Sequence, residues 1–468
     1  GYAGRLEPGG RASSGHLPDR LNTALTAPER HKPMSADRNK LRRDIRFIGA
    51  SLLVLNAVIG AGIFALPSKV AVNAGLLSPW LFLVVGLLIL AVVLTFAELA
   101  SYYDNTGGPV IYATEAFGPF AGFSTGWILF IARTASFAAN ATVMATYLAS
   151  LSDVFAGDGP RAIIISTIVA GLTWANVSGV RDGVRTMAVL TFLKVTPLLL
   201  LVLLGLQHVT GTTLLPSAPW LIEELGSTTL LLIYAYVGFE TIAVTAGETS
   251  RPRSTLPRAL VGTVIVTGLL YFTIVLVFVS VIPADRYGDA TLVDVGRTLA
   301  GPIGAVAITL AAVFSIGGNL AGSMLAAPRL IYSLAENRLL PNWFGHVHEK
   351  YATPDRCILV MGGIAWTLAM TGTFVKLAVA STVARLLAYI VCIVSLPAVR
   401  RKASAAVREQ AYRLKGGLAI PVAALAICVW LLLQSKAESW IAVTILFAIG
   451  ALFYGIERHT GVAGAPDD

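Results

Sequence analysis

The sequence predicts an all-α membrane protein with about twelve transmembrane helices, and three observations indicate this class. Of the 468 residues, 56% are hydrophobic and only 13% are charged, whereas about a quarter of the residues in a soluble domain are charged. Apolar stretches of about 20 residues, enough to cross a hydrocarbon core of about 30 Å, recur along most of the chain. Short polar connections separate them. Backbone groups in a bilayer need internal hydrogen bonds, so this pattern predicts a helical bundle.

The distribution of positive charge predicts the orientation of the spans. Lys and Arg gather in every second connection, for example at Arg42, Arg43 and Arg46 before the first span and at Arg400 and Arg401 after the tenth. Because basic connections stay in the cytoplasm, we expect a multi-pass protein of the inner (cytoplasmic) cell membrane with both termini in the cytoplasm. The expected spans are residues 47–70, 78–102, 121–150, 161–179, 186–206, 227–247, 257–282, 301–335, 357–373, 377–398, 418–433 and 439–456.

Composition also argues against several functions. The net charge of +9 is spread over the connections instead of forming one patch, so nucleic acid is not an expected partner. The three cysteines show no CxxC or Cys/His spacing, and the histidines lie in connections and tails, so we expect no metal site and no cofactor. No span carries a Ser/His/Asp or Cys/His arrangement, and no GxxxxGK[ST] motif is present. The sequence therefore does not indicate an enzyme.

Two spans are interrupted by glycine near their middle. The first carries Gly60-Ala61-Gly62, and the sixth, five helices later, carries Gly238 followed by Phe239. Glycines at matching places in two halves indicate broken helices that face one another in an inverted repeat. The alternative is that they only allow close helix packing. The expected domains are a disordered N-terminal segment 1–39, in which residues 1–33 are either disordered or encoded upstream of Met34, a first repeat 40–206, a second repeat 207–398, and two further helices with a tail, 399–468.

Four sequence stretches carry a resemblance to a known family. They are residues 60–64 (GAGIF), residues 98–126, residues 234–240 (YAYVGFE) with Gly247-Glu248, and residues 328–332 (PRLIY) leading to Pro341. In this order and spacing they resemble the amino acid-polyamine-organocation (APC) superfamily of permeases over nearly the whole chain after Met34. The resemblance implies the LeuT-like fold, a five-plus-five inverted repeat in which helices 1 and 6 are broken.

A broken helix supplies the groups that hold a zwitterion. Exposed N–H groups at a helix start attract a carboxylate, and glycine lets the ligand approach the backbone. Leaving either charge of the substrate unpaired in the bilayer would cost several kcal/mol. The resemblance assigns the carboxylate to the amides of the first break and the ammonium to carbonyls of both breaks. The expected substrate-binding residues are Ile59, Gly60, Ala61, Gly62, Tyr234, Ala235, Val237 and Gly238.

Side chains around this backbone site are expected to select the substrate. For each of them, ordinary helix packing is the alternative to direct contact. The candidates are Ser136 and Phe137 on the third span, Tyr236 and Phe239 on the sixth, and Ser315 and Asn319 on the eighth.

Lys194, Arg133 and Arg385 lie well inside expected spans, where ionisable residues are functional candidates. Lys194 lies about two turns into the fifth span. By the resemblance, its ammonium takes the place of a sodium ion and contacts carbonyls near Asn56 to Ile59. It either releases and regains a proton during transport or stays a fixed structural cation. Arg133 and Arg385 remain charged at any relevant pH, so they cannot carry protons. Pairing with Glu240 or Glu98 is the expected role, and lining the pathway or forming a gate are the alternatives.

These observations together predict a secondary active transporter. We expect it to move amino acids, neutral L-amino acids in particular, across the cytoplasmic membrane by alternating access, independently of sodium and with proton coupling or exchange. Its expected partners are a small-molecule substrate (an amino acid or amine), the lipid bilayer and protons. The alternatives are a sodium-coupled symporter, a polyamine or amine permease, and a membrane sensor with the same fold that does not transport.

Overall fold

The computed structural model describes residues 45–104, 107–155, 157–179, 184–215 and 224–463. The expected disordered segment 1–39 lies outside these ranges. Within them the chain forms α-helices and no β-strand. The helices are α1 (Phe47–Val58), α2 (Gly62–Ala74), α3 (Ser78–Ser101), α4 (Pro109–Phe117), α5 (Pro119–Ala149), α6 (Asp158–Val177), α7 (Val184–Gly205), α8 (Gly211–Leu214), α9 (Leu225–Ile233), α10 (Thr241–Val244), α11 (Pro252–Val281), α12 (Leu292–Glu336), α13 (Asp355–Thr371), α14 (Phe374–Lys402), α15 (Ala405–Gln410), α16 (Ala419–Leu433) and α17 (Ala437–Ala463).

The helices confirm the predicted all-α membrane fold. Among the described residues, 8 helical stretches are long and apolar enough to cross a membrane. These stretches, together with α1, α9–α10, α13 and α16, cover the twelve predicted spans. The eighth span is preceded by a separate helical segment, because α12 contains non-helical backbone at Ala300 and Gly301.

Both predicted helix breaks are present, and the two breaks contact each other. The first helix leaves helical geometry at Ile59 (φ −79°, ψ 86°) and resumes at Gly62. A Cβ atom on Gly62 would lie 2.8 Å from the Ala235 Cα. In the second break, Gly238 has φ +108°, and its Cβ would lie 2.6 Å from the Ala57 carbonyl oxygen. Glycine is therefore required at both positions, by close approach and, at Gly238, also by conformation.

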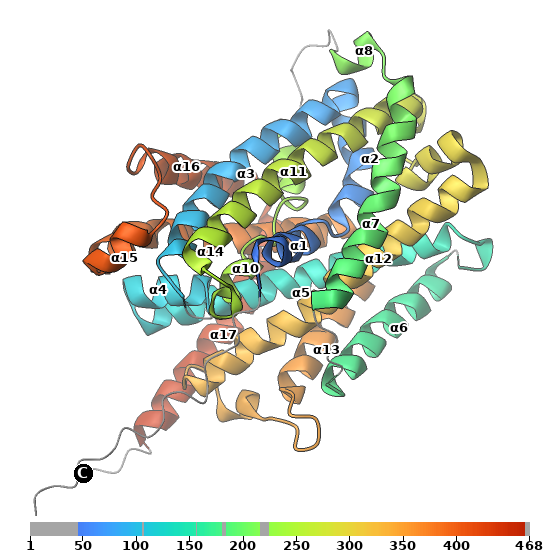
Figure 1. The fold of residues 1–468 in the computed structure, drawn as a ribbon. Helices are drawn as coiled ribbons and strands as arrows, with labels where there is room; N and C mark the ends of the chain where they lie inside the picture. The colour runs from blue at the N-terminus through green and yellow to red at the C-terminus, as the bar shows by residue number, and fades with distance from the viewer. Residues whose placement is uncertain (1–44, 105–106, 156, 180–183, 216–223, 464–468) are drawn as a thin grey trace, which may run out of the picture. The chain divides into compact units, whose positions relative to one another are not determined.

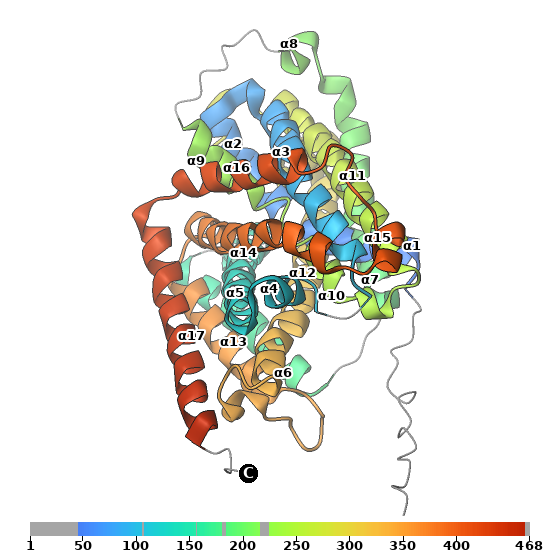
Figure 2. The same ribbon diagram turned by 90° about the vertical axis from the view of Figure 1, so that its left-hand side faces the viewer.

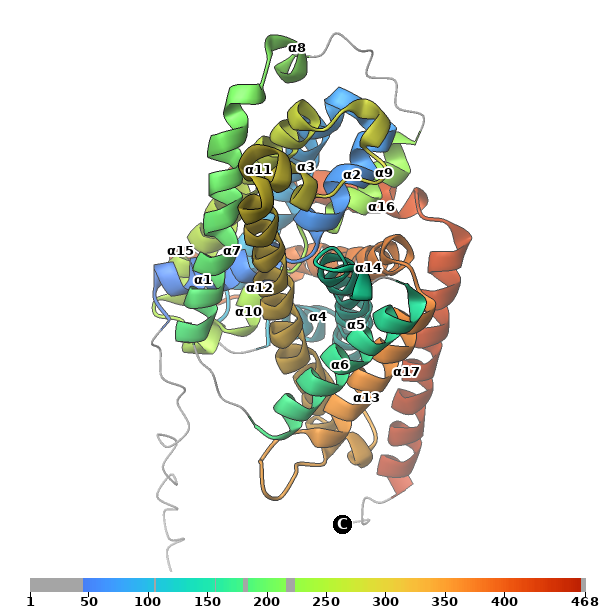
Figure 3. The ribbon, with the colours of Figure 1, turned by 90° about the vertical axis from the view of Figure 1, so that its right-hand side faces the viewer.

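The long helices pack around these breaks. α3 and α11 lie side by side, and α1 packs against α11 and α7 (Figure 1). α5 contacts both α12 and α14. α16 and α17 lie at the edge of the bundle, α16 against α3 and α14, and α17 against α14 and α5 (Figure 2). α6 lies along α13 (Figure 3). Each break is therefore surrounded by continuous helices.

Hydrogen bonds tie the start of α1 to the segment after α10. The Ile45 N–H donates to the Glu248 carbonyl (3.1 Å), and the Ser250 N–H donates to the Ile45 carbonyl (2.8 Å). The start of α1 and the segment after α10 therefore lie at the same end of the bundle. This end is called the α1 end below.

Candidate functional site

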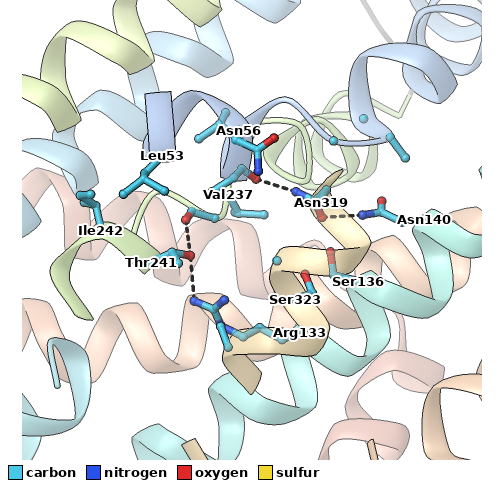
Figure 4. Close-up of a pocket in the computed structure, with 18 of the residues that line it drawn as sticks. Leu53, Asn56, Arg133, Ser136, Asn140, Val237, Thr241, Ile242, Asn319 and Ser323 are labelled. Atoms are coloured by element: carbon cyan, nitrogen blue, oxygen red, sulfur yellow. Dashed lines mark hydrogen bonds between the residues drawn. The ribbon is translucent and has the colours of Figure 1, made fainter. Parts of the chain in front are cut away.

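A cavity lies between the two breaks. Its volume is about 210 Å³, far above the roughly 15 Å³ in which a single water molecule fits. Residues of both breaks and of α1, α5, α10, α12 and α14 line it (Figure 4). The cavity is therefore large enough for a small organic solute.

The carbonyls at the end of α1 are already occupied by protein donors. The Lys194 ammonium, which is 0% exposed, donates to the Asn56 carbonyl (3.3 Å), the Asn56 Oδ1 (2.9 Å) and the Ile59 carbonyl (2.9 Å). Ser315 Oγ also donates to the Ile59 carbonyl, at 3.0 Å. A cation is favourable at a helix C-terminus, where carbonyls lack helical partners. Lys194 supplies that cation within the protein.

The start of α2 offers free donors. Ala61 and Gly62 both line the cavity. Within the described ranges, no acceptor receives either of their N–H groups. This is expected for the first turn of a helix, and it leaves two backbone donors beside the cavity.

The second break offers free acceptors. Tyr234 and Val237 line the cavity, whereas Ala235 does not. Among the described residues, no donor contacts the carbonyls of Tyr234, Ala235 or Val237. Among the residues that line the cavity, the first break thus has N–H groups without a described acceptor, and the second has carbonyls without a described donor.

A chain of hydrogen-bonded side chains in the wall of the cavity joins the second break, α5, α12 and α1. The Tyr234 hydroxyl donates to Asn140 Oδ1 (2.7 Å) and lies 3.2 Å from Ser136 Oγ. Asn140 Nδ2 donates to Asn319 Oδ1 (2.7 Å), and Asn319 Nδ2 donates to the Ala57 carbonyl (2.9 Å; Figure 4). Asn140 was not among the sequence candidates. It lies one turn from Ser136, on the same face of α5.

The remaining sequence candidates do not line the cavity. Ser315 is buried against the first break, as described above. Phe137 and Phe239 are fully buried, and Phe239 packs on Tyr389 at 5.3 Å between ring centroids. The Tyr236 hydroxyl donates to the Phe82 carbonyl at 2.7 Å. In this conformation these side chains support the walls instead of facing the cavity.

A buried ionic cluster lies on the α1-end side of Ser136. Glu240 Oε1 is 3.6 Å from an Arg133 guanidinium nitrogen and 3.5 Å from Arg385 Nε. Glu240 Oε2 accepts from the Gly238 N–H (3.0 Å) and the Tyr389 hydroxyl (2.7 Å). The expected pairing of both arginines is thus with Glu240. Both arginines line the cavity. Within the described ranges, no group of three or more His, Cys, Asp or Glu residues is placed to hold a metal ion.

Contacts beyond the first break join α2 to α5 and the second break to α14. The Tyr147 hydroxyl donates to the Phe64 carbonyl (2.8 Å), and the Tyr234 ring packs on Phe374. At the α1 end the lining includes Leu53, Thr245 and Leu325, of which Leu325 is 41% exposed. The cavity therefore leads to the α1 end of the bundle.

Comparison with known proteins gives a family match over most of the chain. A family model described as amino acid permease matches residues 45–461. The chain is 29% identical to the serine/threonine exchanger SteT of Bacillus subtilis, over 69% of this chain and 75% of that protein. It is 24% identical to the methylthioribose transporter of the same species, over 88% of this chain and 93% of that protein. It is 23% identical to the branched-chain amino acid permease BcaP of B. subtilis, over 88% of this chain and 92% of that protein.

Proposed function

Because this chain belongs to the amino acid permease family, we propose that it transports amino acids across the cytoplasmic membrane by alternating access. Family membership makes it a membrane transporter and not an enzyme. The observation that carries the substrate class is the cavity between the breaks, with free amides on one side and free carbonyls on the other. These are the two kinds of group that an α-amino acid zwitterion requires.

The proposed binding mode places the substrate carboxylate at the first break and its ammonium at the second. The amides of Ala61 and Gly62, beside Gly60, take the carboxylate. The carbonyls of Tyr234 and Val237 take the ammonium, with Ala235 and Gly238 shaping the break. Ile59 supports the site instead of binding the ammonium, because its carbonyl already accepts from two protein donors.

The proposed substrates are neutral L-amino acids. Two of the relatives are named for serine and threonine and for branched-chain amino acids. Recognition through backbone groups leaves the side chain of the substrate unspecified, which suits a transporter of several amino acids. Ser136 and Asn319 are the side chains of the original candidate set that line the cavity.

Transport is proposed to be independent of sodium. The carbonyls that would bind a metal cation at the end of α1 are held by the Lys194 ammonium. A second cation there would meet electrostatic repulsion and would lack acceptors. Proton coupling through Lys194 and exchange of one amino acid for another are the two proposed modes.

The cavity is proposed to open towards the cytoplasm. It leads to the α1 end, and α1 follows the basic segment that the sequence pattern places in the cytoplasm. The contact between Tyr147 and Phe64 then closes the outer side. The structure would correspond to the inward-facing state of the cycle.

Uptake of labelled amino acids into proteoliposomes tests this function. We expect uptake to reach the same rate in sodium and in choline buffers. Vesicles preloaded with unlabelled amino acid separate exchange from proton coupling, which a pH-sensitive dye in the vesicle lumen would report. A strict requirement for sodium would overturn the coupling proposal, and binding without any uptake or exchange would indicate a sensor.

A further inference from the structure

The Arg385 side chain faces the cavity without a hydrogen-bond acceptor. It is 6% exposed, and Arg385 Nε lacks a hydrogen-bond partner. Among the described residues, none accepts a hydrogen bond from its guanidinium, whose nearest anion is Glu240 at 3.5 Å. Arg133, in contrast, donates to Thr241 Oγ1 at 2.9 Å. A guanidinium carries five N–H donors, and buried donors left without acceptors are unfavourable.

The cluster around Arg385 carries excess positive charge. It contains two guanidinium groups, Arg133 and Arg385, and one carboxylate, Glu240. Arginine stays protonated in proteins, so the cluster has a net charge of at least +1 whatever the protonation of Glu240. Among the residues that line the cavity none is acidic. A bound amino acid with a neutral side chain has no net charge, so it leaves the positive charge of the cluster uncompensated.

This charge lies in the same cavity as the proposed backbone site, because Arg133 and Arg385 line it together with residues of both breaks. Arg133 and Asn140 are seven residues apart on α5, about 10 Å along the helix axis. Asn140 bonds to Asn319, and a Cβ on Gly60 would lie 3.1 Å from the Asn319 side chain. The cluster therefore faces the part of the cavity that the side chain of a bound amino acid would occupy.

We propose that Arg385 binds the side chain of the transported amino acid and selects side chains that end in an oxygen acceptor. A carboxylate binds most strongly, because it accepts two parallel hydrogen bonds from a guanidinium and neutralises the charge of the cluster. An amide binds less strongly, an apolar side chain less again, and a cationic side chain or polyamine is rejected. This inference rests on the proposed function and extends its substrates from neutral to acidic amino acids.

Thermal stabilisation of the purified full chain by four ligands tests the inference. The probes are L-glutamate, L-glutamine, L-leucine and L-lysine, whose dissociation constants follow from the stabilisation at several concentrations. We expect affinity to fall in that order for the wild type. In Arg385→Gln the ratio of glutamate affinity to leucine affinity should fall by about 10- to 100-fold, equivalent to about 1.4–2.8 kcal/mol.

Two further variants make the result interpretable. Arg385→Lys keeps the charge but loses the planar pair of donors, so it should still reject lysine while binding glutamate more weakly than the wild type. Arg297→Gln makes the same change as Arg385→Gln at an arginine whose side chain is 58% exposed, and it should leave the affinity ratio unchanged.

The outcomes separate the two proposals. If amino acids stabilise the wild type but Arg385→Gln lowers only the melting temperature and not the affinity ratio, Arg385 is a structural partner of Glu240 and this inference is overturned. If lysine stabilises the wild type as well as glutamate does, the inference also fails while the proposed function stands. If none of the four amino acids stabilises the wild type, this inference is overturned, and the uptake of other labelled amino acids into proteoliposomes decides whether the proposed function stands.

Discussion

Replacing Lys194 with methionine should destabilise the first helix break. The ammonium makes three hydrogen bonds, two to Asn56 and one to the Ile59 carbonyl. Hydrogen bonds to a charged group contribute about 1.5–3 kcal/mol each, so their loss removes roughly 4–9 kcal/mol. Methionine has a similar length and no longer needs desolvation of a charge, which returns several kcal/mol. We expect a net loss of about 2–4 kcal/mol of stability.

The assay is thermal unfolding in detergent with and without substrate. For a chain of this size, about 1 °C per kcal/mol is expected, so the Lys194→Met melting temperature should fall by about 2–4 °C. Stabilisation by substrate should also be lost, because the Ile59 segment holds the start of α2 in place. The control is Lys376→Met, since Lys376 is exposed and pairs with exposed Glu438 at 3.0 Å. A surface pair of this kind contributes little. Equal melting temperatures for the two variants, with intact ligand response in Lys194→Met, would refute the reasoning.

Two other substitutions test the structural parts around the site. Glu98→Gln breaks a buried bidentate pair with Arg400 (2.8 and 2.9 Å). The free energy of unfolding should fall by about 3–5 kcal/mol, which thermal unfolding would show as a lower melting temperature. An unchanged melting temperature would show that the fold does not need this pair. Gly238→Ala should abolish thermal stabilisation by the ligand, because Gly238 has φ +108° and a Cβ there would lie 2.6 Å from the Ala57 carbonyl oxygen. The control is Gly171→Ala, where a Cβ meets nothing within 4 Å. Normal ligand binding by Gly238→Ala would contradict the close contact of the two breaks.

The helix breaks could be predicted from the sequence because of where their glycines lie. Single mid-span glycines also occur inside unbroken helices of this chain, such as Gly86 in α3 and Gly268 in α11, but glycines at matching places five helices apart indicate a pair of facing breaks. The spans were predictable for the same reason, since the length of an apolar stretch is a local property. The sequence does not show which backbone each glycine approaches. In the structure Gly62 lies against Ala235 of the second break, and Gly238 lies against the Ala57 carbonyl of α1.

The lining of the cavity was only partly predictable. Arg133, Ser136 and Asn140 follow a spacing of three and four residues and share one face of α5, and all three line the cavity. Phe137 lies four residues after Arg133 and three before Asn140, yet it is fully buried and does not line the cavity, so helical spacing alone could not separate it from the lining residues. Tyr236 is different. It lies in the second break, where no helical period applies, so its hydrogen bond to Phe82 could not be read from spacing.

Pairs that are distant in sequence were the least predictable. Glu98 lies at the end of its span, where contact with water is the usual expectation. In the structure it is 0% exposed and is paired with Arg400, 302 residues later. The Leu414 N–H also donates to it, at 3.1 Å. A buried carboxylate needs such partners, but the sequence does not show which of the many basic residues supplies the charge.

The two breaks differ in how completely the protein satisfies them, and this difference indicates which part of the site responds to the substrate. Carbonyls of the first break accept from Lys194, Ser315 and Asn319. This break is therefore held in place before a substrate arrives. The carbonyls of Tyr234 and Val237 have no described donor. A bound ammonium would satisfy them with a charged donor, so we expect binding to order mainly the second break. We therefore expect residues 234–240 to become more protected from hydrogen exchange when substrate binds, and residues 56–59 to change little. Equal protection of both segments would show that the first break is also ordered by the substrate.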